Sequence, residues 1–174
     1  MYLGYIERQM AQHCGIHALN MVMGFRAITE NEMPAIGTRL LQRKADEGTL
    51  LQDEVMEWHI RGAGNYSNEI LAEALRSMTP PRTMIPQAET GSADILLDQA
   101  VEGMLIYVPG HWMAARAQGN DLFVLDSLTG AKKLDTEGLN KIIQRPDTRA
   151  FLITSGAFQR QSHLIVRGMW QNAP

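Results

Sequence analysis

Apolar positions in the first half of the chain recur at helical spacing. Ile16, Leu19, Val22 and Met23 lie three or four residues apart, and this run stops at Gly24. The spacing predicts a short helix that begins just before Ile16. The same periodicity predicts further helical stretches with three sets of apolar positions: Ile36, Leu40 and Leu41; Leu51, Val55 and Trp58; and Ile70, Leu71, Ala74 and Leu75.

Two patterns compete for the start of the helix that contains Ile36. With Asn31 as the N-cap, Pro34 falls in the first turn, where its missing N–H costs nothing. Thr29 with Glu32 matches a capping box, but a start there places Pro34 deeper in the helix. We therefore predict a start at Asn31, and an end near Gly48.

The second half of the chain has the shorter, alternating runs of β-strands. Strands are predicted at 104–108, 111–117, 121–126 and 149–155, with a helix at 136–144 between the last two. Ser92 is predicted to cap a helix that runs through Ile95 and Leu96 to Val101. Helices followed by antiparallel strands make the fold class α+β.

Length and composition agree with one globular domain that spans residues 1–174, with an extra strand at 164–166 and a tail left open for residues 157–174. Hydrophobic residues make up 45% and charged residues 20% of the chain. The formal charge of −3 gives no basic field for nucleic acid, and no apolar stretch is long enough to span a membrane. No secretory signal is visible, and one free thiol fits a reducing compartment. We therefore expect a cytoplasmic protein, or one in a host cytosol if a pathogen encodes it.

Cys14 is the single cysteine, so it can form neither an internal disulfide nor a thiolate metal site. It lies in the first turn of the first predicted helix, where backbone N–H groups and the helix dipole favour the thiolate. We therefore expect its pKa to fall from about 8.5 toward neutrality. The alternative is a buried cysteine that only packs in the core. Gln9, five residues upstream, could donate to a tetrahedral oxyanion together with the backbone N–H of Cys14.

A base and an orienting acid come from the predicted hairpin. His111 opens a strand after the Pro109–Gly110 turn, and Asp126 ends the following strand. A hairpin through Gly119 brings the end of its second strand back beside the start of its first. Asp126 should therefore hold one nitrogen of His111 and leave the other for the thiol. His59 and His163 have no partners at metal-ligand spacing, so we expect no metal site and no cofactor.

The segment from Tyr5 to Asn20, Tyr-Ile-Glu-Arg-Gln-Met-Ala-Gln-His-Cys-Gly-Ile-His-Ala-Leu-Asn, resembles the nucleophile motif of Josephin domains without a gap. Gly64-Asn65-Tyr66, His111-Trp112 and Leu125-Asp126-Ser127-Leu128 resemble later motifs of that family in the same order. The resemblance covers about residues 2–155, and Met21 departs from it where the family often has a second asparagine. It implies a papain-like cysteine protease that removes ubiquitin, with a helical hairpin projecting from the body. It also implies Gln9 as oxyanion donor, Cys14 as nucleophile, His111 as base and Asp126 as orienting residue.

From this resemblance we expect a deubiquitinase that cleaves after the C-terminal glycine of ubiquitin or a similar modifier, with ubiquitin conjugates as its partners. Two other classes stay open. One is a papain-like protease that processes a viral polyprotein or a double-glycine leader peptide; those peptidases prefer aspartate where this chain has His13. The other is a non-catalytic module that binds ubiquitin, which would not need a nucleophile, a base and an acid together.

Overall fold

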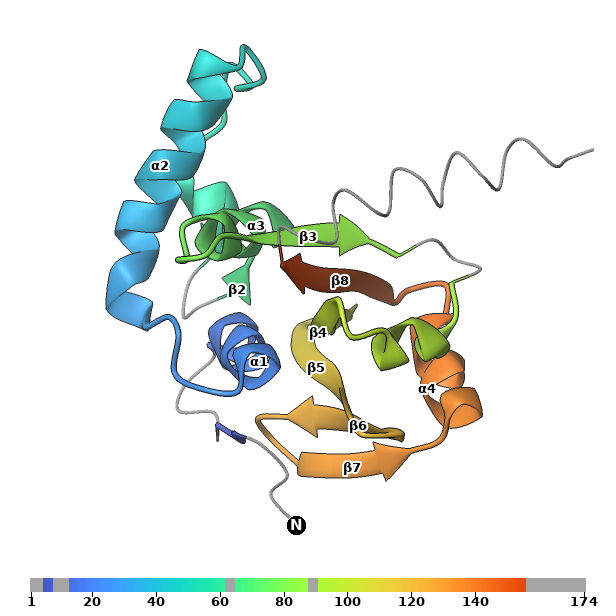
Figure 1. Ribbon diagram of the computed structural model, residues 1–174. Helices are drawn as coiled ribbons and strands as arrows, with labels where there is room; N and C mark the ends of the chain where they lie inside the picture. Colours follow the sequence, from blue (N-terminus) through green and yellow to red (C-terminus); the bar gives the residue numbers. More distant parts are fainter. Residues whose placement is uncertain (1–4, 8–12, 62–64, 88–90, 156–174) are drawn as a thin grey trace, which may run out of the picture.

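A six-stranded antiparallel sheet forms the centre of the molecule, in the order β3-β8-β4-β5-β6-β7 (Figure 1). This computed structural model describes residues 5–7, 13–61, 65–87 and 91–155. The strands of the sheet are β3 Arg82–Pro86, β4 Val101–Val108, β5 His111–Gln118, β6 Asp121–Asp126, β7 Gly130–Leu134 and β8 Arg149–Ser155. A separate two-stranded ribbon pairs β1 Ile60–Arg61 with β2 Asn65–Tyr66.

Helices cover both faces of the sheet. Helix α1 packs on one face, while α4 and the 3₁₀ helix η3 lie on the other (Figure 1). Helix α2 projects beyond the sheet as an arm, and α3 packs beside its base. The helices are α1 Cys14–Met23, α2 Met33–Asp46, α3 Asn68–Arg76 and α4 Thr136–Ile143, with 3₁₀ helices η1 Glu30–Glu32, η2 Met56–Trp58 and η3 Ala93–Leu97. None of the helices within the described residues is long and apolar enough to cross a membrane.

Strand alternation divides the core into two clusters. Phe123 and Leu125 of β6 face the cluster around α1, whereas Leu122 and Val124 face the cluster around α4. This is the alternation that the sequence predicts, because successive side chains of a strand point to opposite faces. The pairing of β5 with β6 also confirms the predicted hairpin through residues 119 and 120.

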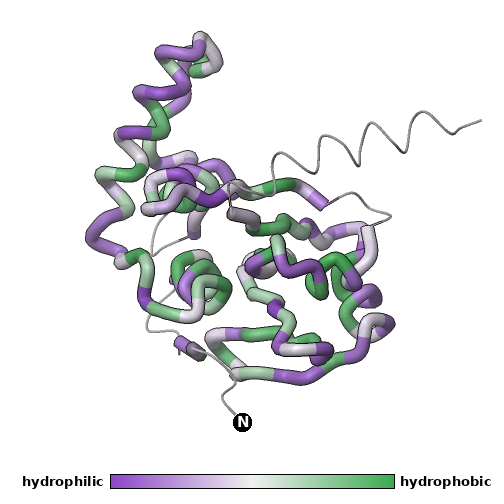
Figure 2. The backbone as a smooth tube through the Cα atoms, in the orientation of Figure 1, coloured by the Kyte–Doolittle hydropathy of each residue, from purple (hydrophilic) through white to green (hydrophobic). Residues whose placement is uncertain are grey.

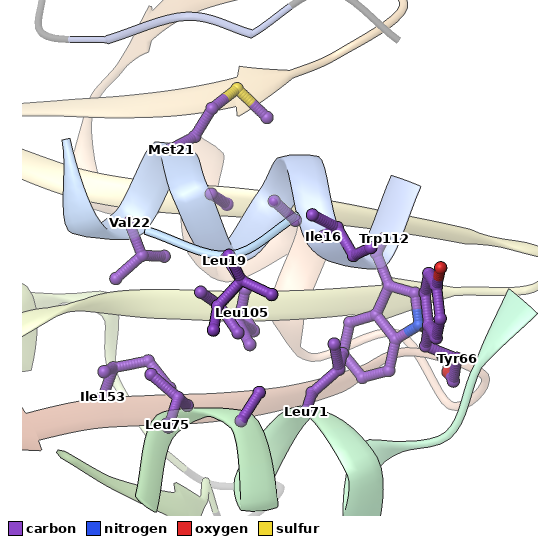
Figure 3. Close-up of a cluster of buried hydrophobic side chains, with 14 of the residues drawn as sticks. Ile16, Leu19, Met21, Val22, Tyr66, Leu71, Leu75, Leu105, Trp112 and Ile153 are labelled. Carbon is purple, nitrogen blue, oxygen red and sulfur yellow. Dashed lines mark hydrogen bonds between the residues drawn. The ribbon is translucent and has the colours of Figure 1, made fainter. Parts of the chain in front are cut away.

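Helix α1 lies close against the sheet over Gly103 of β4. A Cβ atom at Gly103 would lie 2.9 Å from Cγ1 of Val22 and 2.9 Å from the carbonyl oxygen of Ala115. Figure 3 shows Leu19 and Val22 of α1 pointing toward Leu105 and Ile153 of the sheet. The close approach holds the last turn of α1 against the sheet, and the next subsection describes the contacts of its first turn.

Most of the predicted elements are confirmed. Helix α1 ends where expected, with Gly24 at a φ of 79° and its N–H bonded to the carbonyl of Asn20. The four predicted strands and the helix before the last strand are present. The edge strands β3 and β7 were not predicted, because an edge strand packs less of its length in the core and lacks a clear apolar alternation. The suggested strand at 164–166 lies outside the described residues.

The predicted start of α2 at Asn31 is wrong. Thr29 caps the 3₁₀ turn η1 through a capping box with Glu32, whose carboxylate accepts the backbone N–H of Thr29 at 2.8 Å. Helix α2 then begins at Met33, which still places Pro34 in its first turn. The two sequence patterns are compatible because a 3₁₀ turn fills the space between them.

The predicted helix through Leu51, Val55 and Trp58 is also wrong, except for the 3₁₀ turn at its end. The carboxylate of Glu54 accepts the backbone N–H of Leu51 at 3.1 Å, which fixes a turn instead of a helix. The arm is therefore α2 with an irregular return segment, residues 47–58. Leu51, Val55 and Trp58 are 59%, 45% and 44% exposed rather than packed together. Figure 2 shows that α2 alternates between hydrophobic and hydrophilic residues while the centre of the molecule is mainly hydrophobic.

The segment after Ser92 forms a shorter helix than expected. The hydroxyl of Ser92 accepts the backbone N–H of Asp94, as a cap should, but η3 ends at Leu97. Asp98 adopts an extended backbone conformation, and Val101 already pairs with Thr154 of β8. Val101 therefore belongs to β4, which begins three residues before the predicted strand.

Candidate active site

Cys14 is the first residue of α1 and is 3% exposed. The turn around it packs tightly: a Cβ atom on Gly15 would lie 3.2 Å from Cδ2 of Tyr66 and 3.4 Å from Cδ1 of Trp112. Figure 3 shows Tyr66 and Trp112 together at the Ile16 end of α1. Cys14, the candidate nucleophile, thus lies where the start of α1 meets the β1–β2 ribbon and strand β5.

The expected fall in the pKa of the Cys14 thiol is not observed. Burial raises this pKa above its usual value, and the backbone N–H groups of Trp112, Gly15 and Cys14 itself offset only part of the rise. The negative charge of Asp126 raises it further. Desolvation outweighs the helix terminus because the side chain is almost fully enclosed. The isolated sulfur is therefore a thiol, and a thiolate requires a partner that takes its proton.

His111 and Asp126 form the predicted pair. Nε2 of His111 lies 2.9 Å from Oδ1 of Asp126, and both side chains are largely buried. With the carboxylate ionised, Nε2 carries the proton that it donates, and Nδ1 is left as the free acceptor. Trp112, which follows His111 in β5, lies against the first turn of α1: its Cδ1 is 3.4 Å from where a Cβ on Gly15 would lie. His111 and Asp126 thus lie at one end of the β5–β6 hairpin, and the residue next to His111 contacts the turn that begins with Cys14.

Asp126 is held by its own turn. Its Oδ1 also accepts the backbone N–H of Leu128 at 2.8 Å, and its Oδ2 accepts the hydroxyl of Thr129 at 3.0 Å. Burial alone would raise the pKa of Asp126, but the N–H of Leu128 and the contact with His111 outweigh it, so the net shift is downward. The carboxylate therefore stays ionised and can fix the tautomer of the imidazole.

Gln9, the expected oxyanion donor, lies outside the described residues. The segment just before it, however, is tied to α1. Asn20, which is fully buried, donates to the carboxylate of Glu7 at 2.8 Å and to the carbonyl of Ile28 at 2.9 Å. Its side-chain oxygen accepts the backbone N–H of Ala27 and of Ile28, each at 3.0 Å. Asn20 thus braces the chain on both sides of the nucleophile helix.

A cleft of about 520 Å³ opens beside the candidate base. Gly110 and Trp112, the two neighbours of His111, form part of its wall. The rest of the wall comes from η2, the β1–β2 ribbon, the start of α3, strands β4 and β8 and the turn before β8, with these residues: Trp58, Arg61, Asn65, Tyr66, Ser67, Asn68, Tyr107, Pro146, Asp147, Arg149 and Phe151. Cys14 and His111 themselves are not among the lining residues.

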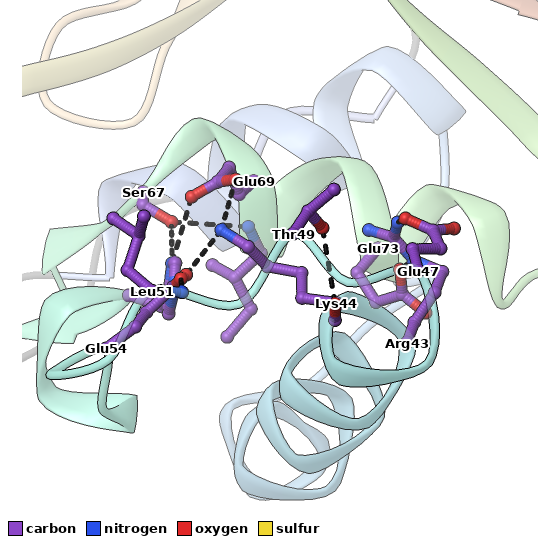
Figure 4. A network of polar contacts seen from close by, with 11 residues as sticks. Arg43, Lys44, Glu47, Thr49, Leu51, Glu54, Ser67, Glu69 and Glu73 are labelled. Atoms are coloured by element: carbon purple, nitrogen blue, oxygen red, sulfur yellow. Dashed lines mark hydrogen bonds and ion pairs between the residues drawn. The ribbon is translucent and has the colours of Figure 1, made fainter.

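His59 was assigned no partners from the sequence, and this is wrong. Its Nε2 lies 2.9 Å from Oε1 of Glu54, and Glu69 approaches its Nδ1 at 3.6 Å. The ligand atoms of these three residues lie within 4.8 Å of one another, as in a metal site. The ammonium of Lys44 already pairs with Glu54 and Glu69, at 2.9 Å from the latter (Figure 4). The cluster is therefore a salt-bridge network that joins the last turn of α2 to the return segment and to α3, and its positive charge comes from lysine.

Sequence reasoning missed this network because its members are scattered over 26 positions from Lys44 to Glu69. It also gave no role to Tyr66, which contacts a neighbour of Cys14 and a neighbour of His111. The hydroxyl of Tyr66 is 2.9 Å from Nδ1 of His13, and its carbonyl accepts Nε1 of Trp112 at 3.1 Å. The one sequence signal for Tyr66 was its place in the motif Gly64-Asn65-Tyr66, which resembles a motif of a known family.

The family profile described as Josephin matches residues 9–153. No curated protein matches the chain closely enough to count as a relative. One solved structure, a double glycine motif protease from an AMS/PCAT transporter in complex with the leader peptide, is 12% identical with a TM-score of 0.48. The alignment covers 87% of this chain and 91% of that one. Because the profile covers most of the sequence, the chain belongs to the Josephin family, whose domains are papain-like thiol proteases.

Proposed function

We propose that this protein is a deubiquitinase that hydrolyses the bond after the C-terminal glycine of ubiquitin or a ubiquitin-like modifier. The observation that carries the proposal is the meeting of three elements in a chain of the Josephin family. Cys14 begins a helix, the first turn of that helix packs against Trp112, and the preceding His111 is hydrogen-bonded to Asp126. A module that only binds ubiquitin would not need this arrangement.

In the proposed reaction, Nδ1 of His111 takes the proton of the Cys14 thiol, and the thiolate attacks the carbonyl carbon of the glycine. The tetrahedral oxyanion is stabilised by the backbone N–H of Cys14 and by the amide of Gln9. When the C–N bond breaks, the imidazolium gives its proton to the leaving amine. A thioester remains on Cys14, and a water molecule deprotonated by His111 hydrolyses it to free the carboxylate and the thiol.

The environment of the sulfur supports the order of these steps. Burial holds Cys14 as a thiol, so the proton must pass to the imidazole before or during attack. The ionised Asp126 keeps a proton on Nε2 and thereby leaves Nδ1 basic. The cleft beside Gly110 and Trp112 offers the path for the extended tail of the modifier.

The test is covalent labelling with ubiquitin that carries a C-terminal vinyl electrophile, run in parallel with ubiquitin-like modifiers and a double-glycine leader peptide. We expect a ubiquitin adduct on Cys14, turnover of a fluorogenic ubiquitin substrate, and neither with Cys14→Ala. Cleavage of the leader peptide without any ubiquitin or modifier adduct would overturn the proposed substrate but not the thiol protease chemistry. Undiminished turnover by Cys14→Ala would overturn the proposed nucleophile.

A further inference from the structure

Tyr66 makes three different contacts with the neighbours of the proposed catalytic residues. Its hydroxyl is 2.9 Å from Nδ1 of His13, which precedes Cys14. Its ring packs where a side chain on Gly15, the residue after Cys14, would have to lie. Its carbonyl accepts the indole N–H of Trp112, the residue after His111, at 3.1 Å.

These contacts join two elements that the chain does not connect locally. Cys14 lies on α1 and His111 lies on β5, 97 residues apart in the sequence. The relative position of sulfur and imidazole must be held to a few tenths of an ångström for efficient proton transfer. Tyr66 is in contact with both sides and is 6% exposed, so it cannot move without disturbing one of them.

His13 links Tyr66 to Glu30. Its Nε2 lies 3.2 Å from the carboxylate of Glu30, and its ring stacks on Tyr66 with centroids 6.0 Å apart. A proton on Nε2, favoured by Glu30, leaves Nδ1 to accept the hydroxyl of Tyr66. Burial, the nearby Glu30 and Cys14 raise the pKa of Tyr66 to about 12, so this hydroxyl keeps its proton near neutral pH.

We propose that Tyr66, fixed by His13, is a positioning residue that sets the geometry of Cys14 relative to His111. The catalytic test of this inference rests on the proposed function, because it measures cleavage of a ubiquitin substrate. The chemical test, alkylation of Cys14, does not depend on that function. It assigns Tyr66 no contact with the reacting atoms. Its effect passes through the residues that flank the nucleophile and the base.

The test compares Tyr66→Phe, His13→Leu and the double variant in kcat and KM on the fluorogenic ubiquitin substrate. Tyr66→Phe removes only the hydroxyl and keeps both the ring packing and the backbone carbonyl. We expect kcat to fall about tenfold, the size of one lost buried hydrogen bond, with KM within about twofold. The double variant should be no slower than the slower single variant, because both changes break the same contact.

Two further variants complete the design. His13→Gln can still offer an amide to the tyrosine hydroxyl, so it should recover most of the kcat that His13→Leu loses. Glu137→Gln removes an exposed carboxylate that pairs with Lys141 on α4, far from the cleft, and should match the wild type. If Tyr66 had a purely structural role, Tyr66→Phe would lower thermal stability. In that case kcat would not fall at a nearly constant KM, and His13→Gln would not recover the kcat that His13→Leu loses.

The second readout is alkylation of Cys14 by iodoacetamide at neutral pH, which needs no substrate and is site-specific because the chain has a single cysteine. We expect Tyr66→Phe to slow it severalfold. Slowed alkylation in a protein that does not cleave ubiquitin would support the positioning role and contradict the proposed substrate. Unchanged kcat and unchanged alkylation in Tyr66→Phe, or additive losses in the double variant, would overturn the positioning role.

Discussion

Nε2 of His111 lies 2.9 Å from Oδ1 of Asp126, although 15 positions separate the two residues. The hairpin of β5 and β6 makes this contact, because the first residue of one strand and the last residue of the next lie at the same end. The same Oδ1 also accepts the N–H of Leu128, whereas Oδ2 accepts the hydroxyl of Thr129. The two carboxylate oxygens are therefore not equivalent, and this has a testable consequence.

Asp126→Asn should be far more active than Asp126→Ala. The asparagine oxygen can take the place of Oδ1 and accept from both His111 and Leu128, while its amide donates to the hydroxyl of Thr129. We expect kcat to fall by no more than about tenfold for asparagine, because its oxygen keeps the contact with His111, and by about 10⁴ for alanine, by analogy with the loss of the orienting aspartate in a catalytic triad. The measurement is kcat on the fluorogenic ubiquitin substrate. Equal losses in the two variants would show that the charge, and not the orientation, is what His111 needs.

His111→Gln should shift the alkylation of Cys14 to higher pH than that of an ordinary thiol. Burial raises the pKa of this sulfur, so without the imidazole the thiolate forms only when the pH rises above the usual thiol range. The measurement is the rate of reaction with iodoacetamide as a function of pH, with glutathione as the reference thiol. In the wild type, reaction should extend to lower pH because an ion pair with His111 supplies thiolate. A variant with the wild-type profile would contradict the role of His111 as proton acceptor.

Gly103→Ala should destabilise the fold by about 1–3 kcal/mol, as other overpacked cores do. The new Cβ would lie 2.9 Å from a backbone carbonyl that cannot move without disturbing the sheet. The measurement is the free energy of unfolding in urea. Gly15→Ala is the matched comparison, because its Cβ would meet only side-chain atoms, at 3.2 Å or more. We expect Gly15→Ala to lose less stability but more activity, since the displaced side chains are those of Tyr66 and Trp112.

Lys44→Met should lower the melting temperature of the protein more than Lys141→Met does. Lys44, in the last turn of α2, pairs with Glu54 and Glu69 and is largely buried, whereas Lys141 forms an exposed pair with Glu137. Removing the buried cation leaves Glu54 with a charge that water cannot reach easily. Thermal unfolding at neutral pH measures the difference. Equal shifts in the two variants would contradict the importance of the network.

The loss in Lys44→Met should also depend on pH. The hydrogen bond from Lys44, with that from the backbone N–H of Leu51, lowers the pKa of Glu54 from 4.5 to about 2. Because the folded-state pKa is lowered, this stabilisation is complete above about pH 4.5 and disappears as the pH falls toward 2. The difference in melting temperature between wild type and variant should therefore be largest near neutral pH and narrow under acid conditions. A difference that widens as the pH falls would contradict this account.

The arm shows where sequence reasoning failed. Leu51, Val55 and Trp58 have the spacing of a helix face, yet their segment is irregular and exposed. The deciding interactions are long-range: Glu54 pairs with Lys44 on α2, which also pairs with Glu69 on α3, and Glu54 accepts the backbone N–H of Leu51. Periodicity reports only on neighbours along the chain, so it could not register a buried charge network. By contrast, Pro34, Gly24 and Ser92 act through local backbone geometry, and the effects expected of them near their own positions are observed.

The sequence by itself determined the strands around His111 and Asp126 and the helix that begins at Cys14, because alternation, turn residues and caps act over a few residues. It also led to the pairing of His111 with Asp126, since a tight hairpin links the two directly. Only the tertiary structure decided that the thiol pKa rises instead of falling, since desolvation depends on how the folded chain buries Cys14. The bridging position of Tyr66 was likewise decided only in three dimensions, because it requires α1, the β2 ribbon and β5 to meet at one point.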